Sequence, residues 1–181
     1  LYGPTEATVL VTHRVMQVGD SNRSLGLPIA NSQVLILDAD LQPVDEQVMG
    51  EVYIIGPGVS LGYVNEPQQA ASAFVELTVP GGRNLQAYRS GDLAKWTTDG
   101  IVLGGRCDDQ VKIRGLRIEL GEIQARLTQI DGIQEAAVLA REDVPGEKRL
   151  VAYYTGAPLE IETLRSHLLE NLPDYMVPAV F

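Results

Sequence analysis

The sequence lacks the features that define several large classes of protein. It contains one cysteine, Cys107, among 181 residues, so an internal disulfide is excluded. No apolar run approaches the roughly 18 residues that a membrane-spanning helix needs. It has no block of lysine and arginine, and its 14 basic and 24 acidic residues give a formal charge of −10. The sequence therefore argues against a membrane span and against electrostatic binding to nucleic acid.

The two ends of the sequence also lack the features of a complete chain. It opens at Leu1 without a methionine, and no basic segment followed by an apolar one forms a targeting leader. It stops abruptly at Phe181. We interpret it as a piece of a longer chain, rather than a mature protein whose leader has been removed, and we expect it to be cytoplasmic.

The composition that remains is typical of a folded protein. Apolar residues make up 45% of the chain and charged residues 21%, which excludes wholesale disorder. The length permits one domain or two small ones. Neither internal repeats nor low-complexity segments are present.

The first half of the sequence predicts short strands separated by turns. Residues 32–37 and 51–55 are β-rich apolar runs bounded by turn residues. Residues 66–74 have helical composition, with a proline in the first turn. Residues 80–82 predict a loop. Residues 88–93 predict a further turn, because a Gly-Asp pair is common in turns.

The second half has a different pattern. Residues 111–114 alternate apolar and basic, which predicts a strand with one cationic face. Gly115, at the first central position of a two-residue turn, would join it to a returning strand. A helix with Leu120, Ile123, Leu127 and Ile130 on one face, strands at 135–140 and 149–154, and a helix with Ile161, Leu164 and Leu168 on one face then follow. This order predicts an α+β domain that begins near residues 106–109.

The first candidate site is the turn Tyr2-Gly3-Pro4-Thr5-Glu6. Glycine and proline restrict its conformation, which would hold an aromatic ring, a hydroxyl and a carboxylate in fixed positions. The tyrosine suits stacking on a base, the threonine can donate to a phosphate oxygen, and the glutamate can hold Mg²⁺ as a hard oxygen ligand. The alternative is an ordinary turn without a ligand.

Two further segments carry candidate groups. Asp92 could accept hydrogen bonds from two vicinal hydroxyls, as on ribose, or it could simply form a turn with Gly91. Residues 105–119 gather positive charge that is unusual in an acidic chain, from Arg106, Lys112, Arg114 and Arg117. This segment is either a mobile cationic arm beside a phosphate or a solvated hairpin face.

Five segments, taken in order, resemble the adenylation domain of nonribosomal peptide synthetases, within the adenylate-forming enzyme superfamily. They are YGPTE (2–6), GEVYIIGPGVSLGY (50–63), YRSGDL (88–93), GRCDDQVKIRGLRIELGEI (105–123) and LPDYMVP (172–178). The last two favour peptide synthetases over acid–CoA ligases. The resemblance implies an α+β chain in which residues 1–107 end the large nucleotide-binding core, with short strands in a barrel-like arrangement. Residues 108–181 would then be a small mobile α+β lid.

The resemblance also implies roles for single residues. Thr5, Glu6 and Arg106 would be catalytic. The nucleotide-binding groups would be Tyr2 stacked on adenine, Gly3 in the same turn, Thr5 at the α-phosphate, Glu6 at Mg²⁺, Asp92 at the ribose hydroxyls and Arg106 at ribose or phosphate. Asp108 would be the hinge of the lid, and Gly115 would line the tunnel for a phosphopantetheine arm. The amino-acid side-chain pocket would include Leu1, Val9 and Leu10.

The implied activity is the formation of aminoacyl-AMP from an amino acid and ATP with Mg²⁺, followed by transfer to a carrier-protein phosphopantetheine thiol. The implied partners are a peptidyl carrier protein, the N-terminal remainder of the domain and a small helper protein. The family's Ser/Thr/Gly-rich phosphate loop should lie before Leu1, and its catalytic lysine beyond Phe181. We therefore expect the isolated chain to be inactive. The alternatives are an acid–CoA ligase and a non-catalytic fragment that docks a carrier.

Overall fold

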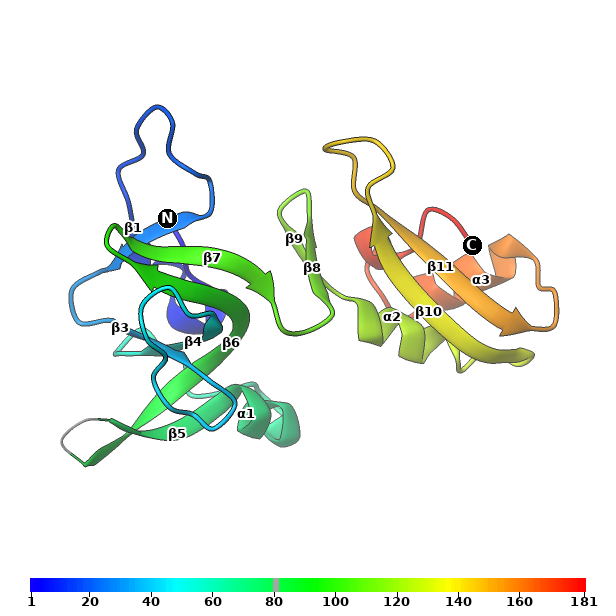
Figure 1. Cartoon of the computed structure of the whole chain (residues 1–181). Helices are drawn as coiled ribbons and strands as arrows, with labels where there is room; N and C mark the ends of the chain where they lie inside the picture. The colour runs from blue at the N-terminus through cyan, green and yellow to red at the C-terminus, as the bar shows by residue number, and fades with distance from the viewer. Residues whose placement is uncertain (80–81) are drawn as a thin grey trace. The chain divides into compact units, whose positions relative to one another are not determined.

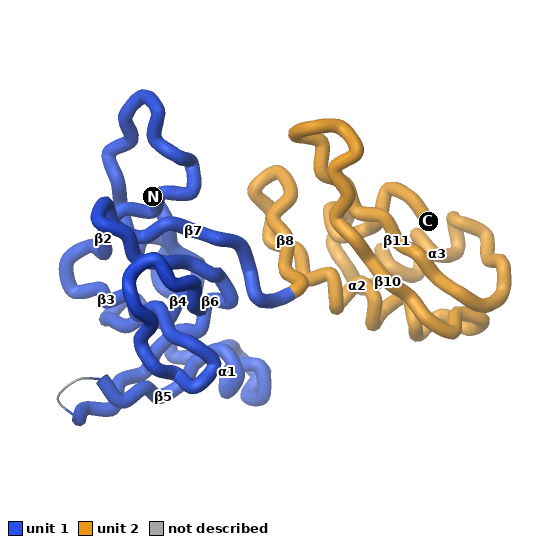
Figure 2. Tube along the Cα trace, in the orientation of Figure 1, with its two compact units in different colours: residues 1–108 blue, residues 109–181 orange. Residues whose placement is uncertain are grey.

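The computed structural model describes residues 1–79 and 82–181, which divide into two compact units (Figure 1). The first unit is Leu1–Asp108 and the second is Asp109–Phe181 (Figure 2). The division falls one residue beyond the predicted one, which followed residue 107. Pro80 and Gly81, in the predicted loop at 80–82, lie outside the described residues.

The first unit is built on a seven-stranded antiparallel sheet with the order β1-β2-β7-β6-β4-β3, in which β5 also pairs with β6. The strands are β1 Thr12–His13, β2 Ser24–Pro28, β3 Gln33–Leu37, β4 Gly50–Ile55, β5 Phe74–Val79, β6 Arg83–Thr97 and β7 Gly100–Arg106. A 3-10 turn at Thr5–Ala7 and the helix α1 at Pro67–Ala73 complete the unit. The predicted strands at 32–37 and 51–55 and the predicted helix are confirmed.

The sheet is open, which corrects the barrel-like arrangement implied by the resemblance. The long strand β6 has β4 along one side, while β5 and then β7 follow one another along its other side. In the part of the chain that the structure describes, β1 and β3 end the strand order and no ladder joins them. A barrel requires that its first and last strands pair with each other, so this sheet does not close.

The segment Tyr88-Arg89-Ser90-Gly91-Asp92-Leu93 lies inside β6, so the turn predicted there is wrong. Strand β4 pairs with β6 on both sides of Gly91, and β7 pairs with β6 from Asp92 onward. The φ of +73° at Gly91 marks an irregular point in the strand. The hydrogen bonds of two neighbouring strands thus outweigh the local turn preference of a Gly-Asp pair.

Both faces of β4 are buried, which explains its unbroken apolar sequence. Val52 and Ile54 pack in one hydrophobic cluster, whereas Tyr53 and Ile55 pack in another. Because successive side chains of a strand point to opposite faces, a strand that is covered on both sides has no polar positions to alternate.

The second unit contains two hairpins and two helices, which confirms the predicted α+β class for this half. Its elements are β8 Gln110–Ile113, β9 Leu116–Glu119, α2 Leu120–Leu127, β10 Ile133–Arg141, β11 Arg149–Gly156, α3 Ile161–Leu169 and a 3-10 turn at Asp174–Met176. In the range that the structure covers, none of the helices is long and apolar enough to cross a membrane.

The core of the second unit lies between its helices and the β10–β11 hairpin. Ile123 and Leu127 of α2 and Leu168 of α3 belong to one buried cluster with Val138 of β10. The predicted apolar faces are confirmed with two exceptions: Ile130 lies beyond the end of α2 at Leu127, and Ile161 is 48% exposed. This residue begins α3, one turn before the buried part of its face.

The turn between β8 and β9 differs by one residue from the predicted turn. Ile113 pairs with Leu116, so the central residues are Arg114 and Gly115 rather than Gly115 and Leu116. Their φ angles are +52° and +81°, as in a type I′ turn, whose twist matches that of the flanking strands. The fit of the turn to the twisted hairpin selects this register even though Arg114 is not a glycine.

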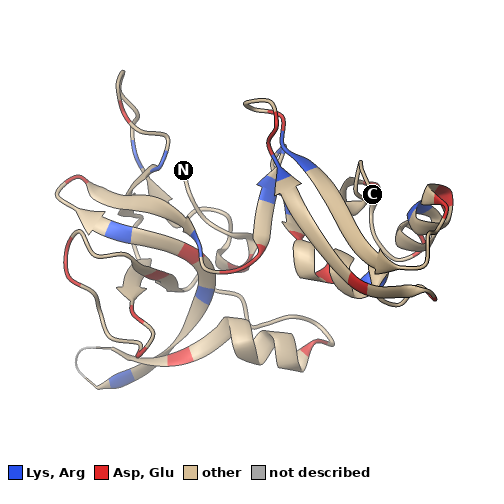
Figure 3. Ribbon diagram, turned by 45° about the vertical axis from the view of Figure 1, so that its right-hand side comes forward, with Lys and Arg blue, Asp and Glu red and all other residues tan. Residues whose placement is uncertain are grey.

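Charged residues of both signs occur in both units (Figure 3). One group of three charged side chains lies at the loop end of the β10–β11 hairpin. Arg141 Nη2 donates to Asp143 Oδ1 at 2.6 Å, and Arg149 Nη2 donates to Asp143 Oδ2 at 2.8 Å. The bonds from Arg149 and Arg141 lower the pKa of Asp143 below its ordinary value of 3.8. The two arginines thereby connect the start of β11 to the end of β10.

We predict that this group weakens only in acid. Because the pKa of Asp143 is lower in the folded state, its stabilising effect is present above pH 3.8 and is lost as the pH falls through the folded value. A carboxyl-carbon NMR titration should place the midpoint of Asp143 below 3.8, and Arg149→Gln should raise that midpoint. The control Arg165→Gln should leave it unchanged, since Arg165 bonds to the Ala179 carbonyl instead. A midpoint insensitive to Arg149→Gln would contradict the assignment.

Candidate functional site

Three predicted site residues meet at the β6–β7 pair of the first unit. Asp92 and Arg106 are directly opposite each other on the two strands, and Arg106 Nη1 donates to Asp92 Oδ1 at 2.6 Å. The Tyr2 hydroxyl donates to the other oxygen, Asp92 Oδ2, at 2.6 Å. The side chains of Asp92 and Arg106 are only 8% and 16% exposed. The fold thus brings the first, third and fourth motifs to one carboxylate.

The Arg106 guanidinium is held from two directions. Its Nε and Nη2 donate to the two carboxylate oxygens of Asp108, each at 2.6 Å, and Nη2 also donates to the Ser90 carbonyl at 3.1 Å. Burial opposes the charge, but the bonds to Asp108 and Asp92 outweigh it and raise the pKa of Arg106. Arg106 is therefore a permanently charged group in a fixed orientation, tied to the last residue of the first unit.

Gly91 makes this arrangement sterically feasible. Its φ is +73°, and a Cβ atom there would lie 2.4 Å from Asp108 Oδ2 and 2.6 Å from Arg106 Nη2. A side chain at this position would collide with the Arg106–Asp108 pair. The sequence did not predict this role; its one signal was the glycine that directly precedes Asp92.

Tyr2 is set into the hydrophobic core of its unit, with 9% of the residue exposed. Burial, followed by the charge of Asp92, raises the pKa of the Tyr2 hydroxyl well above its ordinary value. The hydroxyl therefore keeps its proton and acts as a donor to Asp92. Stacking of the Tyr2 ring on adenine stays a prediction.

The Thr5–Ala7 turn carries the second candidate carboxylate. Glu6 is 9% exposed, and its Oε1 accepts a hydrogen bond from the Tyr63 hydroxyl at 2.7 Å. Burial and the bond to Glu6 raise the pKa of Tyr63. A Cβ on Gly3 would lie 2.5 Å from the Val9 carbonyl oxygen, so the chain folds back over this turn only because Gly3 has no side chain. The Thr5 side chain lies on the exposed side of the turn.

Tyr63 was not predicted as a site residue. It closes the second motif, GEVYIIGPGVSLGY, which was used only to identify the family. Its position at the end of a motif was the signal that could have revealed it, but sequence separation hides its contact with Glu6, 57 residues earlier.

The remaining predicted residues do not join this bonded group. Leu1 and Val9, predicted for the amino-acid pocket, are 90% and 69% exposed, and Leu10 is 36% exposed. Gly115 lies in the second unit, in the turn between β8 and β9. Their implied roles at the pocket and at the phosphopantetheine tunnel stay predictions.

The side chains present fit a shared magnesium site but not an all-protein one. Within residues 1–79 and 82–181, no three His, Cys, Asp or Glu side chains gather in a group that could hold a metal. Glu6 offers one hard carboxylate. Mg²⁺ is commonly bound by one or two carboxylates together with waters and substrate phosphates, so this donor set fits an ion that arrives with a nucleotide.

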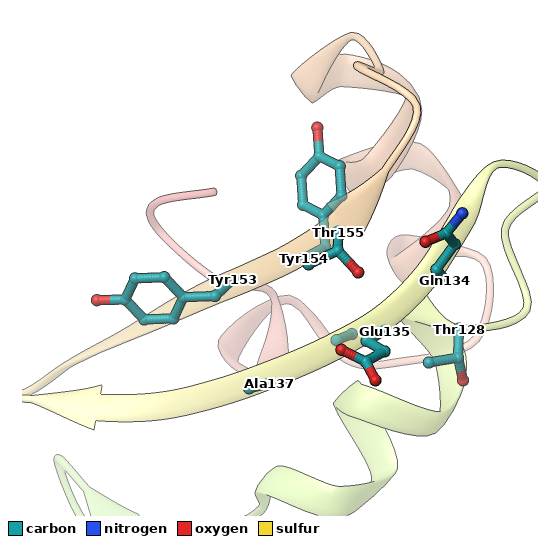
Figure 4. Close-up of a pocket in the computed structure, with 8 residues that line it drawn as sticks. Thr128, Gln134, Glu135, Ala137, Tyr153, Tyr154 and Thr155 are labelled. Carbon is teal, nitrogen blue, oxygen red and sulfur yellow. The ribbon is translucent and has the colours of Figure 1, made fainter.

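A separate hollow of about 530 Å³ lies on the second unit, along β10 and β11 (Figure 4). Tyr153 and Tyr154 of β11 and Gln134 and Glu135 of β10 are among its lining residues. None of the predicted site residues belongs to it. The bonded group around Asp92 is therefore the stronger candidate site.

Comparisons with known proteins show to which family the chain is similar. Residues 1–64 match the family model described as AMP-binding enzyme. The chain is 47% identical over 182 residues to one of the linear gramicidin synthase proteins of Brevibacillus parabrevis, covering 98% of the chain and 4% of that protein. It is 46% identical over 184 residues to a dimodular nonribosomal peptide synthase of Bacillus subtilis, covering 100% of the chain and 8% of that protein.

Solved structures extend the likeness to the fold of nearly the whole chain. A nonribosomal peptide synthetase protein with adenylation and PCP domains, bound to a vinylsulfonamide inhibitor, has 33% identity and a TM-score of 0.84, with 99% of this chain and 32% of that one covered. A four-domain nonribosomal peptide synthetase bound to AMP and glycine has 43% identity and a TM-score of 0.52, with 99% and 14% covered.

These matches identify the chain as part of an AMP-binding enzyme of the adenylate-forming class. More narrowly, the chain belongs to the adenylation domains of nonribosomal peptide synthetases. It spans about 4% of the gramicidin synthase protein and about a third of the adenylation–PCP protein.

Proposed function

We propose that the protein containing this chain activates an amino acid. The amino-acid carboxylate attacks the α-phosphorus of ATP, and pyrophosphate leaves with the electrons of the broken P–O bond. The aminoacyl group of the resulting aminoacyl-AMP then passes to the phosphopantetheine thiol of a peptidyl carrier protein, and AMP leaves.

The observation that carries this proposal is the bonded group of Tyr2, Asp92 and Arg106. A buried carboxylate beside a permanently charged guanidinium offers acceptors for the ribose hydroxyls and donors for an anionic phosphate. The likeness to a synthetase bound to AMP and glycine supports this interpretation.

The residues act by positioning the reactants and neutralising charge. Asp92 accepts from the ribose hydroxyls, Arg106 donates to ribose or phosphate, and Thr5 donates to the α-phosphate. Glu6 would hold Mg²⁺, and the ion would supply positive charge to neutralise the phosphates. Tyr2 and Gly3 complete the nucleotide-binding turn.

The two units have different parts in this scheme. Residues 1–107 end the nucleotide-binding core, and residues 108–181 form the lid, with Asp108 as its hinge. Gly115 lines the tunnel for the phosphopantetheine arm. Leu1, Val9 and Leu10 line the amino-acid pocket. The further partners are the N-terminal remainder of the domain and a small helper protein.

We predict that Asp92→Asn in the complete adenylation domain weakens AMP binding about tenfold to a hundredfold, because hydrogen bonds to a charged acceptor are worth about 1.5–3 kcal/mol. Isothermal titration calorimetry of AMP checks this, with folding verified by circular dichroism. The control Asp20→Asn, which changes a carboxylate bonded to Arg14, should bind AMP normally. Equal AMP affinity in the Asp92 variant and the wild type would contradict the site.

The reaction itself is tested by amino-acid-dependent exchange of labelled pyrophosphate into ATP. We expect exchange by the complete domain and none by the isolated 181 residues. Subsequent transfer to a carrier-protein thiol, but not to free coenzyme A, separates this function from an acid–CoA ligase. Exchange by the isolated chain would overturn the prediction that it is inactive.

A further inference from the structure

The loop before α1 is hydrogen-bonded to the turn that carries Glu6 at three points. The Tyr63 hydroxyl donates to Glu6 Oε1 at 2.7 Å, and the Ser60 amide donates to the Glu6 carbonyl at 2.8 Å. Thr8 Oγ1 donates to the Gly58 carbonyl at 2.7 Å. Both the backbone and the side chain of Glu6 are thus fixed by a segment that is distant in sequence.

The Tyr63 hydroxyl is itself held in place by aromatic packing. The Tyr63 ring meets Phe74 edge-on, with centroids 5.4 Å apart and an interplanar angle of 70°. The Phe74 ring in turn packs against the Tyr88 ring, with centroids 5.4 Å apart. Tyr88 lies in β6 and is 2% exposed. Aromatic pairs of this geometry are favourable, and a buried ring has little freedom to move. The sheet therefore determines where the donor to Glu6 lies.

A phenol is well suited to orient a carboxylate without neutralising it. An ionised carboxylate has about four lone-pair sites, so one hydrogen bond at Oε1 leaves its charge and its capacity to bind a cation intact. The bond does restrict rotation of the carboxylate about the terminal χ3 torsion of Glu6, which otherwise has a broad range of angles. Removing a group that hydrogen-bonds to a metal ligand and orients it commonly lowers the affinity for the metal.

We infer that Tyr63 is a positioning residue for Glu6, and that it orients this carboxylate toward the divalent cation that accompanies the nucleotide phosphates. The inference rests on the proposed function, since it takes Glu6 as the Mg²⁺ ligand. The inference extends the proposed site by Tyr63 and by the segment 58–63, which orient the Glu6 carboxylate.

The test is Tyr63→Phe in the complete adenylation domain, because phenylalanine keeps the ring packed on Phe74 and removes only the hydroxyl. ATP affinity is measured by isothermal titration calorimetry with Mg²⁺ and with EDTA. We expect the gain in affinity due to Mg²⁺ to fall about tenfold in the variant, while affinity in EDTA is unchanged. The Mg²⁺ concentration for half-maximal pyrophosphate exchange should rise in parallel.

Two comparison variants make the result decisive. Glu6→Gln should abolish the gain due to Mg²⁺. Tyr53→Phe, which removes a hydroxyl that donates to Glu51 at 3.3 Å, should behave as the wild type. Loss of the gain in Glu6→Gln with a full gain in Tyr63→Phe would overturn the role of Tyr63 and leave the proposed function standing. A wild-type domain that binds no ATP would instead overturn the proposed function.

Discussion

Replacing Asp92 with alanine should destabilise the first unit by about 3–5 kcal/mol. The substitution leaves the 16%-exposed Arg106 side chain without its most buried partner, and it leaves the Tyr2 hydroxyl, in the core, without an acceptor. Arg106 keeps its bonds to Asp108 and to the Ser90 carbonyl, but it loses its bond to the buried carboxylate, and a donor left unpaired in the core costs far more than an exposed one. The substitution thus breaks two buried interactions at once.

Urea denaturation followed by Trp96 fluorescence checks this prediction, because the single tryptophan lies in β6 and reports on the first unit. Asp20→Ala is the matched control. It removes a carboxylate that likewise pairs with an arginine, Arg14, but this pair is less buried, so its loss should be much smaller. An Asp92→Ala loss below about 1 kcal/mol would show that the bonded group contributes no net stability.

Replacing Gly91 with alanine should cost about 2 kcal/mol, the second-largest effect that we expect, because backbone strain adds to the loss of a partly exposed ion pair. The new Cβ would meet Asp108 Oδ2 at 2.4 Å and Arg106 Nη2 at 2.6 Å, so the bidentate pair must separate. Alanine is also strained at the positive φ of +73°, which glycine adopts without a steric penalty.

The control for Gly91→Ala is Gly19→Ala, measured by the same fluorescence. Gly19 has a φ of +96°, but a Cβ added there would have no described atom within 4 Å, so alanine should add backbone strain alone, about 1 kcal/mol. In a double-mutant cycle, Asp108→Ala should recover part of the Gly91→Ala loss, since it removes one side of the collision. Equal losses at Gly91 and Gly19 would contradict the steric argument.

Much of the local structure could be predicted because it depends on neighbours in sequence. The strand at 51–55, the proline at the start of α1 and the faces of α2 follow from apolar spacing and from residue conformations. The turn predicted at Gly91-Asp92 failed for the opposite reason. Strand β4, which is distant in sequence, pairs with residues on both sides of Gly91, and together with β7 it overrides the local preference of the segment.

The candidate site could be predicted only as a list of groups. Tyr2, Glu6, Asp92 and Arg106 were selected by residue type and motif, and the structure adds that three of them share hydrogen bonds. Ser90, Gly91 and Tyr63 act through a carbonyl oxygen, through the absence of a side chain and through a distant hydroxyl. None of these contributions has a signature in the residue type itself.

The order of residues is enough to identify the family, the α+β class and the chemical groups available to a nucleotide, because five ordered motifs and the apolar spacing can be recognised along the chain. Three features come from the folded unit alone: the sheet stays open, Arg106 donates to both oxygens of Asp108, and Tyr63 donates to Glu6. These outcomes depend on which distant strands and loops pack together, and packing is decided by the shape and burial of the whole unit rather than by any local pattern.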